Sequence, residues 1–145
     1  LHATGHLHLL RSLYGRISVP EQVVHELANG GIRIPELEES DWIDIRPAVI
    51  PNSIQIVPDL GIGEAGAISI ALQAPQKTLV LLDDSLARRI AKINKLTVTG
   101  TAGVLIRAKR EALVEAVRPI LKSMVKAGFY LKPEHLEMLC RMAGE

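Results

Sequence analysis

Apolar and polar positions follow two different rhythms along the middle of the chain. The residues from Thr78 to Leu82 favour burial, with the β-branched Val80 at their centre, and the run stops at Asp83 and Asp84. Such a run predicts a strand that is covered on both faces, as in a parallel sheet. After Ser85 the apolar residues return at helical spacing. Strand and helix alternate in this way through residues 54–111, which predicts a parallel sheet built by right-handed crossovers.

The same patterns extend toward both ends of the chain. Gly15 ends the first expected helix, Pro20 opens the second, and Gly30 closes it. We expect strands at 17–19, 42–46, 54–57, 78–82 and 96–98, and helices at 7–14, 20–29, 64–73, 85–94, 102–111, 115–127 and 133–143. A chain of 145 residues fits one domain, so we expect residues 1–145 to form a single α/β domain.

Composition indicates a core of aliphatic side chains, because apolar residues make up 48% of the chain and aromatic residues only 3%. Cys140 is the only cysteine, so an internal disulfide is impossible, and we expect a buried thiol and a reducing, cytoplasmic location. No signal-peptide pattern is present. The longest apolar run, residues 65–72, is too short to cross a bilayer, so we expect no membrane partner.

The formal net charge of +1 conceals an uneven distribution of charged side chains. Residues 1–83 carry five basic and ten acidic side chains, a charge of −5, whereas residues 84–126 carry ten basic and three acidic side chains, a charge of +7. This asymmetry predicts a positive surface beside an acidic cleft. Alternatively, Arg88, Arg89, Lys92 and Lys95 form only the solvated face of one helix.

Carboxylates stand at two points that a βαβ arrangement brings to one edge of a sheet. Glu64 lies in the first turn of the helix 64–73, and Asp83 and Asp84 follow the strand 78–82. A helix start and a strand end lie along the same edge, so we expect these carboxylates to converge. Converging oxygen ligands without cysteine suit Mg²⁺ or Mn²⁺. Two such ions about 3.5–4 Å apart would stabilise the attacking and the leaving oxygen in phosphodiester cleavage.

Each of these acids also has a structural explanation. The helix dipole favours a carboxylate such as Glu64 in a first helical turn. Asp84 or Ser85 is a suitable cap for the helix 85–94. Glu26 lies on the flank of the apolar stripe of the helix 20–29, where no spacing argument singles it out.

Two further groups of polar residues are candidates for chemistry. Thr99 and Thr101 follow the strand 96–98 at the same edge of the sheet, where Thr101 alternatively caps the next helix. His2 and His6 stand four residues apart, a spacing that suits a metal site on a helix. Gly5 lies between them and no clear carboxylate partner accompanies them, which disfavours that site.

Four blocks stand out along the sequence, in this order: residues 18–27 (SVPEQVVHEL), 63–68 (GEAGAI), 82–88 (LDDSLAR) and 99–105 (TGTAGVL). Together they resemble successive blocks of PIN-domain proteins. The resemblance runs over nearly the whole chain, to residues 128–130 and the terminal residues 143–145. It is greatest to an uncharacterised bacterial and archaeal branch described as predicted nucleic-acid-binding proteins.

The resemblance implies a three-layer α/β/α sandwich with a central parallel sheet and an acidic pocket that binds Mg²⁺ or Mn²⁺. PIN domains use this pocket to cleave RNA, often as toxins that an antitoxin protein inhibits. Glu26, Glu64 and Asp83 match acids expected to act in catalysis. Glu64, Asp83 and Asp84 match acids expected to hold the metal.

The resemblance also implies where RNA binds. Thr99 and Thr101 are expected near the acidic pocket as polar neighbours. The basic segment 84–126, with Arg88, Arg89 and Lys92 at its start, is expected to hold the RNA backbone.

One part of the family pattern has no counterpart in this sequence. The first aspartate of the family lies on an initial strand ahead of the first helix, and no such strand is present here. Either residues upstream of Leu1 supply it, or the protein lacks one metal ligand and the central strand of the sheet. In the second case apolar sheet faces need a cover, so we expect a partner or a homodimer.

The sequence therefore leads to competing functions. The first is a metal-dependent ribonuclease of the toxin type from toxin–antitoxin pairs. The alternative is a non-catalytic module that binds nucleic acid or an antitoxin-like protein through an incomplete acidic site. A phosphatase with Asp83 as nucleophile is disfavoured, because no Asp-x-Asp pattern or matching lysine motif accompanies it.

Overall fold

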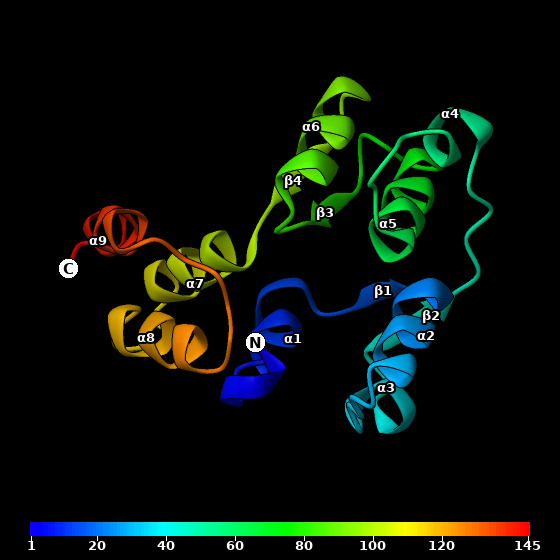
Figure 1. Ribbon diagram of the computed structural model, residues 1–145. Coiled ribbons are helices and arrows are strands. Elements are labelled where there is room, and N and C mark those ends of the chain that lie inside the picture. The colour runs from blue at the N-terminus through cyan, green and yellow to red at the C-terminus, as the bar shows by residue number, and fades with distance from the viewer. The chain divides into compact units, whose positions relative to one another are not determined.

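The computed structural model describes residues 1–145 as a mixed α/β chain with nine α-helices and four short strands (Figure 1). Its contacts divide the chain into two compact units. We call residues 16–100 the sheet unit, because all four strands lie there, and residues 1–15 with 101–145 the helical unit. No helix is both long and apolar enough to cross a membrane.

The strands of the sheet unit pair in parallel, as the sequence predicts. Strand β1 (Ile17–Pro20) pairs with β2 (Ile43–Arg46), and β3 (Leu79–Leu81) pairs with β4 (Thr97–Thr99). The α/β fold class is thereby confirmed. The strands form two separate two-stranded sheets.

Five helices connect these strands. They are α2 (Glu21–Asn29), α3 (Glu36–Glu39), α4 (Asn52–Gln55), α5 (Ile62–Leu72) and α6 (Ser85–Ile93). The strand expected at 54–57 is wrong, because Pro51 precedes the short helix α4 there. Ile54 is buried whereas Ile56 is 77% exposed, so this segment does not bury the alternate side chains of a strand.

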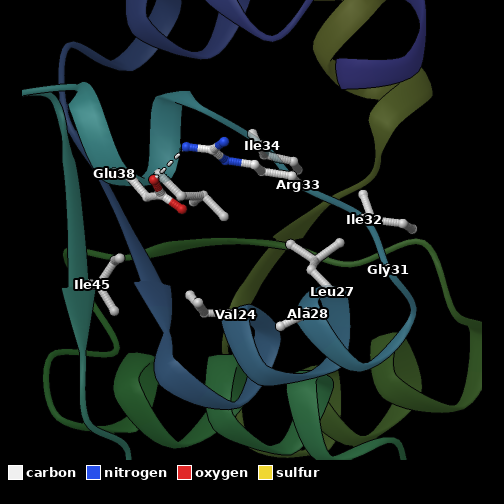
Figure 2. A pocket seen from close by; sticks show the side chains of 10 residues that line it. Val24, Leu27, Ala28, Gly31, Ile32, Arg33, Ile34, Glu38 and Ile45 are labelled. Carbon is white, nitrogen blue, oxygen red and sulfur yellow. Dashed lines mark hydrogen bonds and ion pairs between the residues drawn. The ribbon is translucent and has the colours of Figure 1, made fainter.

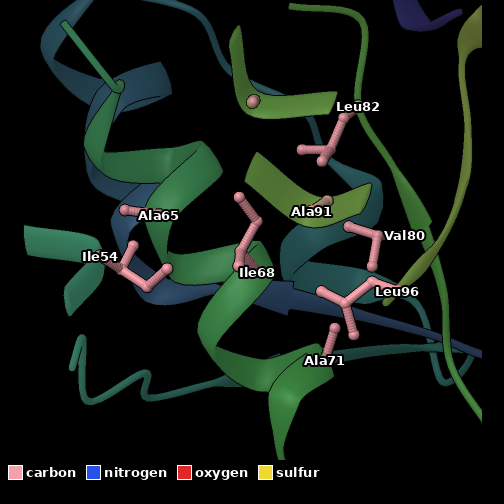
Figure 3. Close-up of a cluster of buried hydrophobic side chains, with 9 residues drawn as sticks. Ile54, Ala65, Ile68, Ala71, Val80, Leu82, Ala91 and Leu96 are labelled. Carbon is pink, nitrogen blue, oxygen red and sulfur yellow. The ribbon is translucent and has the colours of Figure 1, made fainter. Parts of the chain in front are cut away.

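Helix α5 carries much of the core of the sheet unit. Ile68, at its centre, is completely buried, and the small residues Ala87 and Ala91 of α6 are buried as well. Figure 3 shows these elements meeting around Ile68. Side chains from α4, α5, β3, α6 and the residue before β4 form this cluster: Ile54, Ala65, Ile68, Ala71, Val80, Leu82, Ala87, Ala91 and Leu96.

Strand β3 is covered on one face only, which corrects the prediction from its apolar sequence. Val80 is buried in the cluster, whereas Leu79 is 40% and Leu81 37% exposed. Alternate side chains of a strand point to opposite faces, so an apolar run does not establish that both faces are covered.

The helical unit contains α1 (His8–Tyr14), α7 (Thr101–Arg110), α8 (Arg118–Lys126) and α9 (Pro133–Met142), with a short 3₁₀ helix at His2–Thr4. Cys140 is buried, as expected, and burial raises the pKa of its thiol. The large side chains buried most completely in this unit are Leu9, Val104, Leu105, Val117 and Leu121.

Candidate functional site

Four acidic residues line one pocket of the sheet unit, with a volume of about 270 Å³. Glu26 comes from α2, Glu64 from α5, and Asp83 and Asp84 from the turn between β3 and α6. We call this the acidic pocket. Apolar and glycine residues complete its lining: Val23, Gly63, Ala67, Leu81 and Leu82. The structure therefore brings Glu64 and Asp83 to one pocket, as their positions in the sequence predict.

Glu26 reaches the pocket because α2 and α5 approach each other closely. Its Oε1 accepts a hydrogen bond from the backbone N–H of Gly63 at 3.2 Å, in the first turn of α5. A Cβ atom at Gly63 would overlap Oε2 of Glu26 and lie 3.0 Å from Val23 Cγ2. The glycine thus makes room for a carboxylate at the positive end of a helix.

Glu64 lies in the first turn of α5 and is half-buried. Its carboxylate folds back over Gly61, the residue that caps the helix. The two are so close that a Cβ atom at Gly61 would overlap Oε2 of Glu64. A carboxylate so close to exposed helical N–H groups is favoured electrostatically. This helix start therefore holds two carboxylates, one from its own first turn and one from α2.

The adjacent aspartates make different contacts. Asp84 is the cap of α6, since its Oδ1 accepts a hydrogen bond of 2.8 Å from the backbone N–H of Ala87. Of the two candidate caps, Asp84 rather than Ser85 therefore has this role. Asp83 is exposed, and its Oδ1 lies 2.9 Å from the position of a Cβ atom on Gly100.

A family model described as a PIN domain matches residues 1–145. The chain belongs to the PIN-domain family. Comparisons with curated proteins and with solved structures gave no match. Membership of this family suggests a nuclease-type fold and nucleic-acid binding, and PIN domains generally use divalent metal ions.

The donors of the acidic pocket suit a divalent metal in kind. All are carboxylate oxygens, the ligands that Mg²⁺ and Mn²⁺ prefer, and no histidine or cysteine lines the pocket. As the side chains stand, no three His, Cys, Asp or Glu residues of this PIN domain lie close enough to hold an ion. In this arrangement Oε1 of Glu26 accepts from the N–H of Gly63, and Oδ1 of Asp84 accepts from the N–H of Ala87.

The histidine site that the spacing of His2 and His6 suggests is not formed. Gly5 adopts a left-handed conformation with φ of 72°, which ends the 3₁₀ helix between them. Nδ1 of His6 pairs with the hydroxyl of Thr4, and Nδ1 of His8 pairs with the carbonyl of Gly5.

The residues expected to bind nucleic acid lie outside the lining of the acidic pocket. Arg89 and Lys92 are exposed on α6, whereas Arg88 is half-buried. The hydroxyl of Thr99 contacts the carbonyl oxygen of Gly100 at 3.4 Å. Thr101 is buried at the start of α7, in the helical unit.

Two glycines at the start of α5 make room for carboxylates of the acidic pocket, Gly61 for Glu64 and Gly63 for Glu26. Neither glycine was predicted as part of the site. Gly63 and Gly66 stand three residues apart on α5. A Cβ atom at Gly63 would meet Val23 and Glu26, and one at Gly66 would meet Pro20 and Gln22. This spacing of small residues was the signal available for the close approach of α2.

A second pocket of about 330 Å³ lies between α2, α3 and β2 (Figure 2). Its lining is mainly apolar, with Val24 and Leu27 from α2 and Ile45 from β2. Arg33 and Glu38 form an exposed ion pair there, with an N–O distance of 3.0 Å. This pocket therefore has one carboxylate, already paired with an arginine, whereas the acidic pocket has four. The acidic pocket is the better candidate for metal-dependent phosphate chemistry.

Proposed function

We propose that this PIN domain is a metal-dependent ribonuclease of the toxin type. The observation that carries the proposal is the presence of Glu26, Glu64, Asp83 and Asp84 around one pocket, although they come from three separate parts of the chain. Clusters of carboxylates are costly unless a cation or hydrogen-bond donors offset their repulsion.

Each carboxylate has a proposed role. Glu64, Asp83 and the second side-chain oxygen of Asp84 would hold Mg²⁺ or Mn²⁺. Glu26, together with Glu64 and Asp83, would position the attacking water. A bound divalent ion supplies positive charge for the phosphodiester oxygens and lowers the pKa of water. Glu26 is available for this role once it leaves the N–H group of Gly63.

RNA is the proposed substrate, held through its phosphates. Arg89 and Lys92 are exposed on α6, the helix that Asp84 caps beside the acidic pocket. Cationic side chains in this position hold a polyanion and release its counterions. Thr99 is proposed as a polar neighbour of the bound strand, whereas Thr101 is buried and is not proposed to contact it. The cytoplasm is proposed as the location of the reaction.

A titration with Mn²⁺ tests metal binding directly. The melting temperature of the wild-type protein is expected to rise with Mn²⁺, because a ligand that binds only the folded state stabilises it. Glu64→Gln and Asp83→Asn are expected to abolish the rise. Asp44→Asn is the matched control, since Asp44 is exposed on β2 and does not line the pocket.

Cleavage of labelled RNA by the same proteins tests the chemistry. Wild type and Asp44→Asn are expected to cleave with Mn²⁺ and to stop with a chelator, whereas Glu64→Gln and Asp83→Asn are expected to lose at least about a hundredfold in rate. Equal cleavage by all four proteins would assign the activity to a contaminant or to another site.

The alternative is a non-catalytic module that binds nucleic acid or an antitoxin-like protein. The observation that favours it is that no three potential ligands stand close enough to hold a metal ion. An unchanged melting temperature with Mn²⁺, together with retained RNA binding, would support it. Light scattering with and without a candidate antitoxin tests the proposed homodimer and partner.

A further inference from the structure

Arg88 differs from the other cations of α6. It is half-buried, and its Nη1 donates a hydrogen bond of 2.9 Å to the backbone carbonyl of Leu82. Leu82 immediately precedes Asp83, and its own N–H donates to the carbonyl of Thr99 at 2.9 Å. The guanidinium therefore ties the first turns of α6 to the point where β3 and β4 end.

Gly100 provides the space for this arrangement. It is buried, and a Cβ atom there would lie 2.9 Å from Nη1 of Arg88, 2.9 Å from Oδ1 of Asp83 and 3.4 Å from the carbonyl oxygen of Leu82. Gly100 does not adopt a positive φ, so its requirement here is space and not backbone conformation. The guanidinium and the Asp83 carboxylate thus border the same small volume, no farther apart than the sum of the two 2.9 Å distances.

We propose that Arg88 is a positioning residue for Asp83, and not one of the cations that bind phosphate. It fixes the peptide between Leu82 and Asp83 through the carbonyl, and its charge holds the carboxylate at the edge of the acidic pocket. An arginine suits both tasks because its planar group presents several donors in fixed directions. The inference rests on the proposed function in that it assigns Asp83 to metal binding.

Metal affinity distinguishes a cation of α6 that positions Asp83 from one that binds phosphate. Arg88→Gln and Arg89→Gln remove the same charge from adjacent positions. Loss of a residue that orients a ligand typically weakens metal affinity by about 10–100-fold. In calorimetric titrations with Mn²⁺ we expect Arg88→Gln to weaken binding by at least about tenfold, Arg88→Lys to restore part of it, and Arg89→Gln to stay within about twofold of wild type.

A second measurement does not depend on metal. The carbon-13 resonance of the Asp83 carboxyl group, assigned by its loss in Asp83→Asn, is expected to move in Arg88→Gln and in Gly100→Ala but not in Arg89→Gln. Gly100→Ala perturbs the same contact from the residue that follows β4, so it decides the question if Arg88→Gln does not fold. The folded state of each variant is checked by circular dichroism.

The outcomes separate the inference from the proposed function. If wild type binds Mn²⁺ but Arg88→Gln and Arg89→Gln bind it equally well, Arg88 has no positioning role and the ribonuclease proposal stands. If wild type does not bind Mn²⁺, the ribonuclease proposal fails, and the Asp83 resonance alone decides whether Arg88 orients that carboxylate. An unmoved resonance in both Arg88→Gln and Gly100→Ala overturns the inference.

Discussion

A missing methyl group at Gly63 lets α2 approach the start of α5. Because a Cβ atom there would overlap Oε2 of Glu26 and press on Val23, we predict that Gly63→Ala lowers the free energy of unfolding by about 1–3 kcal/mol. We expect the same substitution to push the Glu26 carboxylate away from the N–H of Gly63. Urea denaturation measures the loss of stability, and Mn²⁺ titration measures the effect on the pocket.

Gly30→Ala is the matched control for this substitution. Gly30 ends α2 with a negative φ of −79°, and the nearest atom to an added Cβ would be the carbonyl oxygen of Glu26 at 3.4 Å. We expect its stability to remain within about 0.5 kcal/mol of wild type or to rise slightly. A Gly63→Ala protein as stable as Gly30→Ala would show that α2 and α5 can separate without cost.

Asp84 allows capping and metal binding to be separated by two substitutions. Asp84→Ala removes the acceptor for the Ala87 N–H and is predicted to cost about 1 kcal/mol of stability. Asp84→Asn keeps an equally good cap, so it is expected to unfold like wild type while weakening Mn²⁺ binding. If Asp84→Asn binds Mn²⁺ as tightly as wild type does, Asp84 is a cap alone.

Among the elements, those with local signals were predictable and those that depend on distant contacts were not. Proline or glycine at the starts of α2, α5 and α9 marks helices that the sequence already indicates. The single buried position of α4 and the exposed face of β3 follow from what packs against them. An apolar run does not contain that information.

The candidate site divides in the same way. Glu64 and Asp83 were predictable because a helix start and a strand end share an edge in a βαβ arrangement. The approach of Glu26 to Gly63 joins positions 37 residues apart, and no periodicity within α2 encodes it. The side chains of Arg88 and Arg89 look alike in sequence, and only their surroundings in the fold separate them.

The carboxylate at the start of helix α8 comes from Glu145, 27 residues after Arg118. The two side-chain oxygens of Glu145 accept hydrogen bonds from the backbone N–H groups of Val117 and Arg118, at 2.5 and 3.0 Å. These bonds lower the pKa of the Glu145 carboxyl below its ordinary value of 4.5, and the nearby Lys109 adds to the effect. Glu145 thereby supplies the cap that α8 lacks from its own residues.

This contact predicts an acid-dependent contribution to stability. Since the pKa of Glu145 is lower in the folded state, the contribution is complete above the unfolded pKa of about 4.5 and is lost as pH falls through the folded value. Melting curves between about pH 7 and pH 3 should therefore show Glu145→Gln less stable than wild type at neutral pH, with the difference shrinking in acid.

Glu134→Gln, in the first turn of α9, is the control for the loss of one exposed carboxylate. The difference between wild type and this variant is expected to change less with pH than the difference produced by Glu145→Gln. A constant gap between wild type and Glu145→Gln across the acid range would mean that the carboxylate charge does not support α8.

At the scale of the whole molecule, charge is divided between the two units. The helical unit has nine basic and five acidic side chains, a formal charge of +4, and the sheet unit has eight basic and eleven acidic side chains, a charge of −3. The acidic pocket belongs to the negative unit, yet that unit also carries the cations of α6. Under the proposed function, the cations of α6 offset this negative background for an RNA strand that reaches the pocket.

That role of α6 gives a prediction about salt. For binding of single-stranded RNA, each phosphate contact contributes about 0.7 to the slope of log affinity against log salt concentration. Arg89→Gln and Lys92→Gln are each expected to lower the slope by about this amount, whereas Lys77→Gln, exposed and outside α6, is expected to leave it unchanged. Fluorescence anisotropy between about 50 and 200 mM salt, with a chelator to prevent cleavage, measures these slopes. Equal slopes for the α6 variants and Lys77→Gln would mean that RNA does not run along α6.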